Sequence, residues 1–267
     1  MSKIEKSAFE TLEKMRRENP LVHNITNYVV MNYTANALLS MGASPVMAHA
    51  EEEVAEMASI AGALVINIGT LSKPWIASML KAGRSANSNS TPVILDPVGA
   101  GATRLRTDTA KKIASDIELS VVRGNASEVL SMGGKEAQTK GVDSTHDVDQ
   151  AKEAAVAIAK ELNAVVAITG KVDLVTDGNT TYRVHNGHEL MGMVTGTGCA
   201  ATATIGAFCA VCNDALTATI SALAYFGLAG EVAAGKTNLP GSYAVALIDA
   251  LNQVTPEMLS ENMKIEV

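Results

Sequence analysis

The sequence predicts an α/β protein with a central, mainly parallel β-sheet flanked by helices on both faces. Short apolar runs rich in β-branched residues end in Gly, Asp or Thr, and helical patterns such as residues 148–162 alternate with them. Continuous apolar runs are typical of strands buried on both faces, and their alternation with helices is typical of parallel sheets. The predicted strands are residues 64–68, 93–95, 121–122 and 165–168.

A β-hairpin is expected after these strands. Residues 174–176 and 181–185 flank a turn that contains Asp177-Gly178-Asn179, a composition favoured between antiparallel strands. We therefore expect an antiparallel edge beside the parallel strands. The chain has 267 residues and no linker rich in Pro, Gly or Ser, so we expect a single domain over residues 1–267.

The composition favours a small-molecule partner. Charged residues make up 18% of the chain and its formal net charge is −7, which disfavours binding to nucleic acid or anionic lipid. Three cysteines do not suit a disulfide framework, and residues 1–17 lack the apolar segment of a signal peptide. Cys209 and Cys212 have CxxC spacing but lie in an apolar helical run without a second pair, so a redox or zinc role is not expected. We expect a cytoplasmic protein.

Two uncharged stretches, residues 196–212 and 215–230, approach the length of a short membrane span. Asn213-Asp214 separates them, basic flanks are missing, and Ala, Thr and Gly stand where Leu, Ile and Phe would be expected. We therefore expect helices buried inside the protein, and no membrane partner.

Polar turns follow the predicted strands. Because the carboxyl ends of parallel strands lie at one edge of the sheet, where ligands bind, we expect these turns to converge on one cleft. A glycine-rich turn, Thr195-Gly196-Thr197-Gly198-Cys199, opens a further helix of small residues. Glycines let backbone amides approach an anion, and a helix N-terminus adds unpaired donors. This turn therefore predicts an anion site.

Asp96 stands at the end of a buried strand, ahead of a Pro and two glycines at positions 99 and 101. Asp before Pro is also common in ordinary turns. A carboxylate beside an anion-binding loop suits Mg²⁺, which prefers carboxylate, water and phosphate oxygens. We predict a magnesium site that includes Asp96.

The segment from Asn125 to Glu128 allows two interpretations. Asn followed by Glu three residues later resembles a helix capping box. The segment also follows a strand that ends in Arg123, whose guanidinium could pair with phosphate oxygens and leave Glu128 to order metal-bound water. Thr169, directly after another strand, is equally compatible with a tight turn and with a nucleotide contact.

Polar groups are concentrated between His23 and Asn27, ahead of a predicted amphipathic helix. Thr26 or Asn27 could be the N-cap of that helix, but two amides, a hydroxyl and an imidazole exceed what a cap needs. Residues 44–47 suggest an apolar wall nearby. His23 and His49 are expected to be structural.

Cys199 stands near the first helical position after the glycines, where the helix dipole and backbone donors lower the pKa of a thiol. A nucleophilic role is conceivable, although no Cys–His pair can be read from the sequence. Acyl transfer through Cys199 therefore stays an alternative.

Together these motifs resemble the ribokinase-like superfamily and, within it, the hydroxyethylthiazole kinase family of thiamine salvage. The resemblance implies a ribokinase-like fold without a lid, and phosphorylation of the primary alcohol of 4-methyl-5-(2-hydroxyethyl)thiazole with ATP and Mg²⁺. It also implies a homotrimer with sites at subunit boundaries. The segments that carry it follow the family's order: PLVHNITNYVVMN, GASPVMAHAEEE, INIGTL, ILDPVGAGAT, VVRGNASEV, AITGKVDLVTDG and VTGTGCAATA.

The resemblance also assigns residues to the phosphate side of the site. Asp96 and Glu128 would lie at Mg²⁺ and the triphosphate, and Arg123 and Thr169 would contact ATP. Cys199 occupies the position at which sugar kinases of the superfamily hold an aspartate base. The implied catalytic turn is Gly196, Thr197, Gly198 and Cys199.

On the acceptor side, Met47 and Gly196 would contact the thiazole. Four residues are looser assignments that line the same pocket: Asn24, Asn27, Gly69 and Thr70.

Other functions stay open at this point. A hydroxymethylpyrimidine kinase or an ATP-dependent NAD(P)H-hydrate dehydratase would share the fold and much of the site. A protein that binds nucleotides without catalysis would share the anion loop.

Overall fold

The computed structural model describes residues 2–133 and 148–267. In this part of the chain a nine-stranded sheet has the order β2-β1-β3-β4-β5-β6-β7-β8-β9. The first six strands pair in parallel and the last three are antiparallel, which confirms the predicted mainly parallel sheet. The strands are β1 (Leu21–Ile25), β2 (Ser44–Val46), β3 (Ala63–Asn67), β4 (Val93–Asp96), β5 (Val121–Gly124), β6 (Val165–Ile168), β7 (Asp173–Thr176), β8 (Thr181–Val184) and β9 (Ile265–Glu266).

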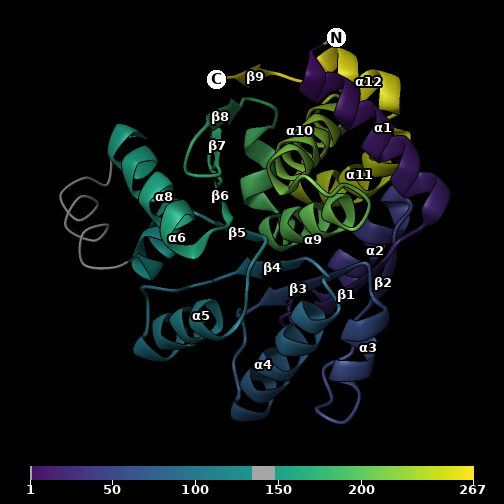
Figure 1. Cartoon of the computed structure of the whole chain (residues 1–267). Coiled ribbons are helices and arrows are strands. Elements are labelled where there is room, and N and C mark those ends of the chain that lie inside the picture. The colour runs from purple at the N-terminus through teal and green to yellow at the C-terminus, as the bar shows by residue number, and fades with distance from the viewer. Residues whose placement is uncertain (1, 134–147) are drawn as a thin grey trace.

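Helices cover both faces of the sheet (Figure 1). Each face has its own apolar core, and the two cores are separated by the strands. One face carries α1 (Lys3–Glu18), α2 (Met31–Met41), α9 (Thr197–Cys209), α10 (Ala215–Ala234), α11 (Pro240–Gln253) and α12 (Pro256–Asn262). The other carries α3 (Val54–Ile60), α4 (Lys73–Ser88), α5 (Arg104–Asp116), α6 (Ala126–Met132) and α8 (Val148–Leu162).

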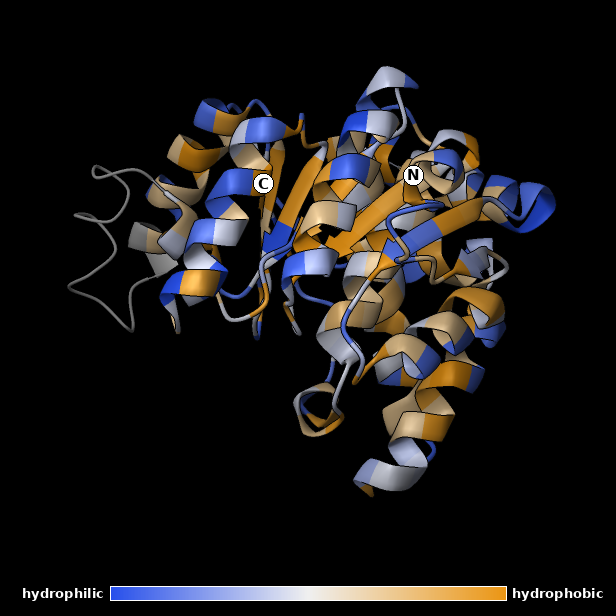
Figure 2. Cartoon of the chain, turned by 90° about the horizontal axis from the view of Figure 1, so that it is seen from below, coloured by the Kyte–Doolittle hydropathy of each residue, from blue (hydrophilic) through white to orange (hydrophobic). Residues whose placement is uncertain are grey.

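Helix α9 lies against the centre of the sheet. Ten consecutive residues at its C-terminal end are buried, as expected for a helix that is apolar on all sides. At Gly206 a Cβ atom would lie 2.7 Å from Val65 Cγ2, so glycine permits the close approach of the helix to β3. Figure 2 shows the apolar strands enclosed between the helical layers. The N-terminus of α9 is thereby held at the carboxyl edge of the parallel strands.

Two sequence-based expectations need correction. The region from His23 to Asn27 contains strand β1, and α2 begins only at Met31 with Val30 as an N-cap that makes no side-chain bond, so neither Thr26 nor Asn27 caps the helix. The hairpin β7–β8 is antiparallel as predicted, but the short strand β9 lies outside it and forms the edge. Polar residues within β1 hid this strand.

Helix α10 is the one described helix that is long and apolar enough to cross a membrane by length and composition. Of its apolar window, 72% is buried inside the fold. Buried core helices pass the same test, which agrees with the expectation that both apolar stretches are interior helices.

The contact between Gly206 and Val65 predicts that substitution by alanine destabilises the protein at Gly206 but stabilises it at Gly241. Gly206→Ala overpacks the core at a cost of about 1–3 kcal/mol, which exceeds the gain in helix propensity of about 1 kcal/mol. Gly241→Ala, in α11 with no atom within 4 Å of the new Cβ, gains stability. Urea unfolding of both variants measures the difference. Equal stabilisation by the two substitutions would contradict this account of α9 packing.

Candidate active site

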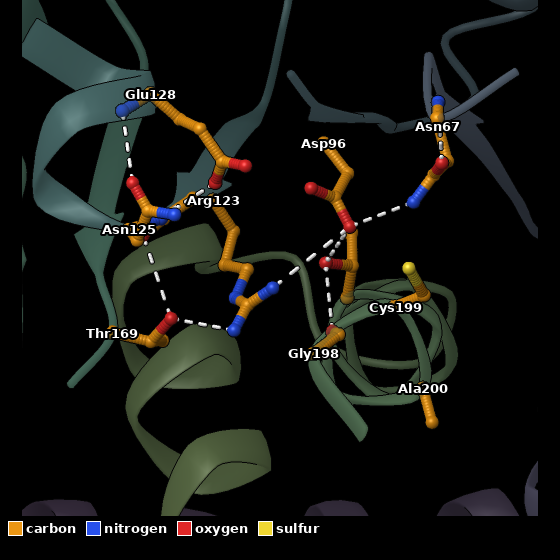
Figure 3. Close-up of polar contacts among 12 residues, drawn as sticks. Asn67, Asp96, Arg123, Asn125, Glu128, Thr169, Gly198, Cys199 and Ala200 are labelled. Carbon is orange, nitrogen blue, oxygen red and sulfur yellow. Dashed lines mark hydrogen bonds and ion pairs between the residues drawn. The ribbon is translucent and has the colours of Figure 1, made fainter. Parts of the chain in front are cut away.

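Five polar turns converge at the carboxyl edge of the sheet, as the sequence predicts. Parallel pairing sets β3 beside β4 with Asn67 opposite Asp96, and β5 beside β6 with Gly124 opposite Ile168. Arg123, Asp96 and the N-terminus of α9 therefore meet, although they are far apart in the sequence (Figure 3). Shared strand direction is the physical reason for the convergence.

The glycine-rich turn is the start of α9 itself. Gly196 is the N-cap with φ of 93°, a conformation that favours glycine, and its position is crowded by Val30. Thr197 is already the first helical residue, so the amides of Thr197, Gly198 and Cys199 belong to the first turn and lack acceptors within the helix. A Cβ at Gly198 would lie 2.9 Å from Arg123 Nη1, so glycine admits the guanidinium to this turn.

Arg123 bridges the two sides of the site. Its side chain is 12% exposed, its Nη2 donates to Thr169 Oγ1, and its Nη1 lies 3.9 Å from Asp96 Oδ2. The Thr169 amide donates to Gly124 O at 2.9 Å, which fixes this residue beside the end of β5. Arg123 and Thr169, which the sequence analysis assigned to the same ligand, are therefore in direct contact.

Asp96 is completely buried at the end of β4. Its Oδ2 accepts hydrogen bonds from Asn67 Nδ2 at 2.9 Å and from Thr202 Oγ1 at 2.8 Å. Burial raises the pKa of Asp96 to about 6, against the opposing effects of Arg123 and of Thr202. At neutral pH the carboxyl is therefore mostly ionised.

Of the two interpretations of residues 125–128, the structure confirms the capping box. The capping box is present, because Asn125 Oδ1 accepts from Glu128 N at 2.9 Å and Glu128 Oε2 accepts from Asn125 N at 2.9 Å. Glu128 Oε1 also accepts from Gly99 N at 2.8 Å. The cap thus holds the Glu128 carboxylate beside the turn that follows Asp96.

These residues fit a magnesium ion. Asp96 Oδ1 is buried and has no hydrogen-bond partner among the described residues, an expensive state for a carboxylate oxygen. No group of three or more His, Cys, Asp or Glu side chains in the described chain is placed so that it could hold a metal ion by itself. Mg²⁺ retains water ligands and binds phosphate oxygens, so one or two carboxylates suffice.

Cys199 lies beside this network with its sulfur toward Asn27 and Asn67. Asn27 Nδ2 donates to Cys199 Sγ at 3.5 Å and to Asn67 Oδ1 at 2.9 Å. Burial, followed by the negative charge of Asp96, raises the pKa of the Cys199 thiol to about 11. The expectation that the helix N-terminus lowers this pKa is therefore wrong.

The looser acceptor-side assignments are partly connected to this network. Gly69 N donates to Asn67 Oδ1 at 3.0 Å, and Thr70 Oγ1 accepts from Tyr28 N at 3.2 Å, so the turns after β1 and β3 adjoin. Asn24 is buried and donates to Val22 O, with its Oδ1 unpaired among the described residues. Met47 is half-buried.

A cleft of about 930 Å³ extends from Arg123 along α9 and α10. Arg123, Thr169 and Gly198 line it together with apolar residues of α10 such as Leu223 and Phe226. The size and the mixed lining suit a nucleotide with its phosphates beside Arg123.

Comparison with known proteins identifies the family. Residues 12–257 match the Hydroxyethylthiazole kinase family. A hydroxyethylthiazole kinase of Desulfotalea psychrophila is 54% identical over 266 residues, which cover 100% of this chain and 97% of that protein. The chain belongs to the hydroxyethylthiazole kinase family.

Solved structures of this family and its superfamily share the fold. The hydroxyethylthiazole kinase protein of Pyrococcus horikoshii OT3 is similar with a TM-score of 0.90 and 48% identity, covering 98% of each chain. A ribokinase-like superfamily protein of Enterococcus faecalis V583 is similar with a TM-score of 0.65 and 12% identity, covering 93% of this chain and 95% of that one. The second likeness concerns the fold alone, and both confirm the predicted architecture.

Sequence reasoning missed several residues of this hydroxyethylthiazole kinase family site. Asn67 and Thr202 hold Asp96, and Asp173 lies in the cleft, where burial raises its pKa to about 6. Asn67 ends an apolar strand and Thr202 lies three residues after Cys199 on α9. These positions in the sequence could have marked both residues as candidates for the site. Only the strand register and the placement of α9 show that both bind Asp96.

The raised pKa of Cys199 predicts slow alkylation at neutral pH. Only the thiolate reacts, so the rate of modification by iodoacetamide rises about tenfold for each pH unit up to about pH 10. Mass spectrometry of the Cys199 peptide measures this rate, with N-acetylcysteine as a control that levels off near its own pKa. A plateau for Cys199 between pH 7 and 8 would show a lowered pKa instead.

Proposed function

We propose that the protein transfers the γ-phosphoryl group of ATP to the primary alcohol of 4-methyl-5-(2-hydroxyethyl)thiazole, with Mg²⁺, in thiamine salvage. The observation that carries this proposal is the meeting of Arg123, Asp96 and Glu128 with the N-terminus of α9, beside a nucleotide-sized cleft that Arg123 itself lines. Family membership supplies the acceptor. We propose further that residues 1–267 act as one kinase domain, in the cytoplasm.

In this proposal the first-turn amides of α9 bind the migrating phosphoryl group. The amides of Gly198 and Cys199 lie in the first turn of α9, at the positive end of the helix dipole. Arg123 lies beside this turn, where it would offset developing negative charge. Asp96 and Glu128 would hold Mg²⁺. When bound, the ion supplies positive charge to the phosphate oxygens.

Cys199 has a modest role here, because a neutral thiol is a poor base. Phosphoryl transfer passes through a loose transition state, so positioning and charge stabilisation provide most of the rate acceleration and the alcohol needs little activation. Asn27 fixes the sulfur position through its hydrogen bond. We propose that Cys199, Asn27, Gly69, Thr70, Gly196, Asn24 and Met47 border the acceptor.

Substitution of the two best-defined groups separates their roles. Cys199→Ala lowers turnover by about 10²-fold or less, whereas Asp96→Ala lowers it more, because it removes the carboxylate that serves the metal. A coupled assay of ADP release with hydroxyethylthiazole, with and without Mg²⁺, measures both. A dead Cys199→Ala enzyme beside a nearly normal Asp96→Ala enzyme would reverse the assignment.

The same assay tests the acceptor. Hydroxyethylthiazole should release ADP well above the rate without an alcohol, while hydroxymethylpyrimidine and a hydrated nicotinamide cofactor should not. If either of the latter two substrates were preferred, the protein would have another activity of the superfamily and the proposed acceptor would be wrong.

We propose that the chain forms a homotrimer with the sites at subunit boundaries. Large apolar side chains, each at least 59% exposed, lie on α2, on α11, on the turn η1 (Glu189–Met193) and on the loops before these helices. This surface patch comes close to the catalytic turn at Val29, because the next residue, Val30, lies against Gly196. A second copy would cover it and close the site. Its members are Tyr28, Val29, Leu39, Met193, Leu239 and Val245.

A charged substitution in this patch tests the assembly. Val245→Asp should lower the mass measured by light scattering from that of a trimer and reduce turnover, because it places a charge in a buried interface. Ile60→Asp, at a 65% exposed residue on the other helical layer, is the matched control and leaves the mass unchanged. A wild-type protein that is monomeric at micromolar concentration would exclude the trimer.

A further inference from the structure

The two oxygens of the Asp96 carboxylate are used unequally. Oδ2 accepts hydrogen bonds from Asn67 at 2.9 Å and Thr202 at 2.8 Å, whereas Oδ1 is buried without a partner among the described residues (Figure 3). A carboxylate oxygen has two lone pairs, so these donors fill the hydrogen-bonding capacity of Oδ2. Oδ1 is therefore the oxygen of Asp96 that remains available to bind a ligand.

Asn67 cannot exchange its amide groups without losing bonds. Its Oδ1 accepts from Asn27 Nδ2 at 2.9 Å and from Gly69 N at 3.0 Å, which leaves Nδ2 facing Asp96. The cross-strand register places Asn67 directly opposite Asp96. The donor is thus fixed from both sides.

Thr202 is fixed by its place on α9. A buried helical threonine commonly bonds the carbonyl four residues earlier, as Thr204 does with Ala200 O at 2.9 Å. Thr202 Oγ1 lies closer to Asp96 Oδ2, at 2.8 Å, than to Gly198 O, at 3.3 Å. The Thr202 hydroxyl has one proton to donate. Because a carboxylate is a stronger acceptor than a backbone carbonyl, Thr202 donates its hydrogen bond to Asp96.

We infer that Asn67 and Thr202 are positioning residues that make Asp96 a one-oxygen ligand and thereby select Mg²⁺ over Ca²⁺. This inference rests on the proposed function. Ca²⁺ takes six to eight oxygens and often binds a carboxylate through both, whereas Mg²⁺ demands octahedral geometry and uses few carboxylate oxygens. Loss of either donor leaves Oδ2 with one hydrogen bond and open capacity, so the carboxylate can turn, binding of Mg²⁺ weakens and discrimination against Ca²⁺ falls.

Thr202→Val tests this with almost no change in side-chain shape. Binding of the non-hydrolysable ATP analogue AMP-PCP is measured by calorimetry without metal, with Mg²⁺ and with Ca²⁺. In the wild-type protein Mg²⁺ should strengthen binding more than Ca²⁺ does. In Thr202→Val the effect of Mg²⁺ should fall about 10–100-fold, the range seen when partners of metal ligands are removed, while binding without metal is unchanged.

Three further variants make the result specific. Thr204→Val removes a buried hydroxyl from the same helix that bonds only a backbone carbonyl, and should bind as the wild type does. Thr202→Ser restores the donor and should restore the preference for Mg²⁺. Asn67→Ala should repeat the defect of Thr202→Val, and melting temperatures identify any variant that is merely unfolded.

Two outcomes overturn different statements. If wild-type binding responds to Mg²⁺ and Thr202→Val and Asn67→Ala respond equally, this inference is wrong and the proposed function stands. If wild-type binding of AMP-PCP is the same with and without Mg²⁺, the proposed metal role fails and the inference fails with it.

Discussion

The close approach of α9 to the centre of the sheet is the constraint on which the site depends. Gly206 permits that approach, and it sets a single rigid helix against the strands that end in Asn67 and Asp96. The same helix carries the first-turn amides and, about 6 Å further along, Thr202. The groups that would bind a phosphoryl group and the group that holds Asp96 therefore keep a fixed separation, which is the pre-organisation that phosphoryl transfer requires.

Charge explains why a nucleotide would enter this site with a cation. Three carboxylates, Asp96, Glu128 and Asp173, lie near Arg123, and two of them are buried enough that their pKa values rise to about 6. One guanidinium between carboxylates does not offset a triphosphate. In the proposed reaction Asp96, through its unpaired oxygen, would hold a divalent ion brought with the nucleotide, and the ion would supply the positive charge that Arg123 alone does not.

The sequence reveals local chemistry better than it reveals neighbours. The ends of the apolar strands, the capping box at Asn125 and the glycines before Cys199 depend on short segments, and the structure has them where the residue types indicate. Strand β1 was missed because His23 and Asn24 interrupt its apolar pattern although both are buried. The roles of Asn67 and Thr202 depend on strand register and on helix placement, which no local pattern contains.

The thiol of Cys199 shows how such neighbours override a local rule. A helix N-terminus favours a negative charge by about 0.3–1 kcal/mol, and about 2 kcal/mol at most. A rise of the pKa from 9.0 to about 11 corresponds to about 3 kcal/mol in the opposite direction. Burial and the Asp96 charge therefore outweigh the dipole. Beside an ionised Asp96 the buried Cys199 thiol stays neutral at neutral pH, so in the proposed reaction the acceptor alcohol would be activated by its position and by charge on the phosphoryl group rather than by Cys199 as a strong base.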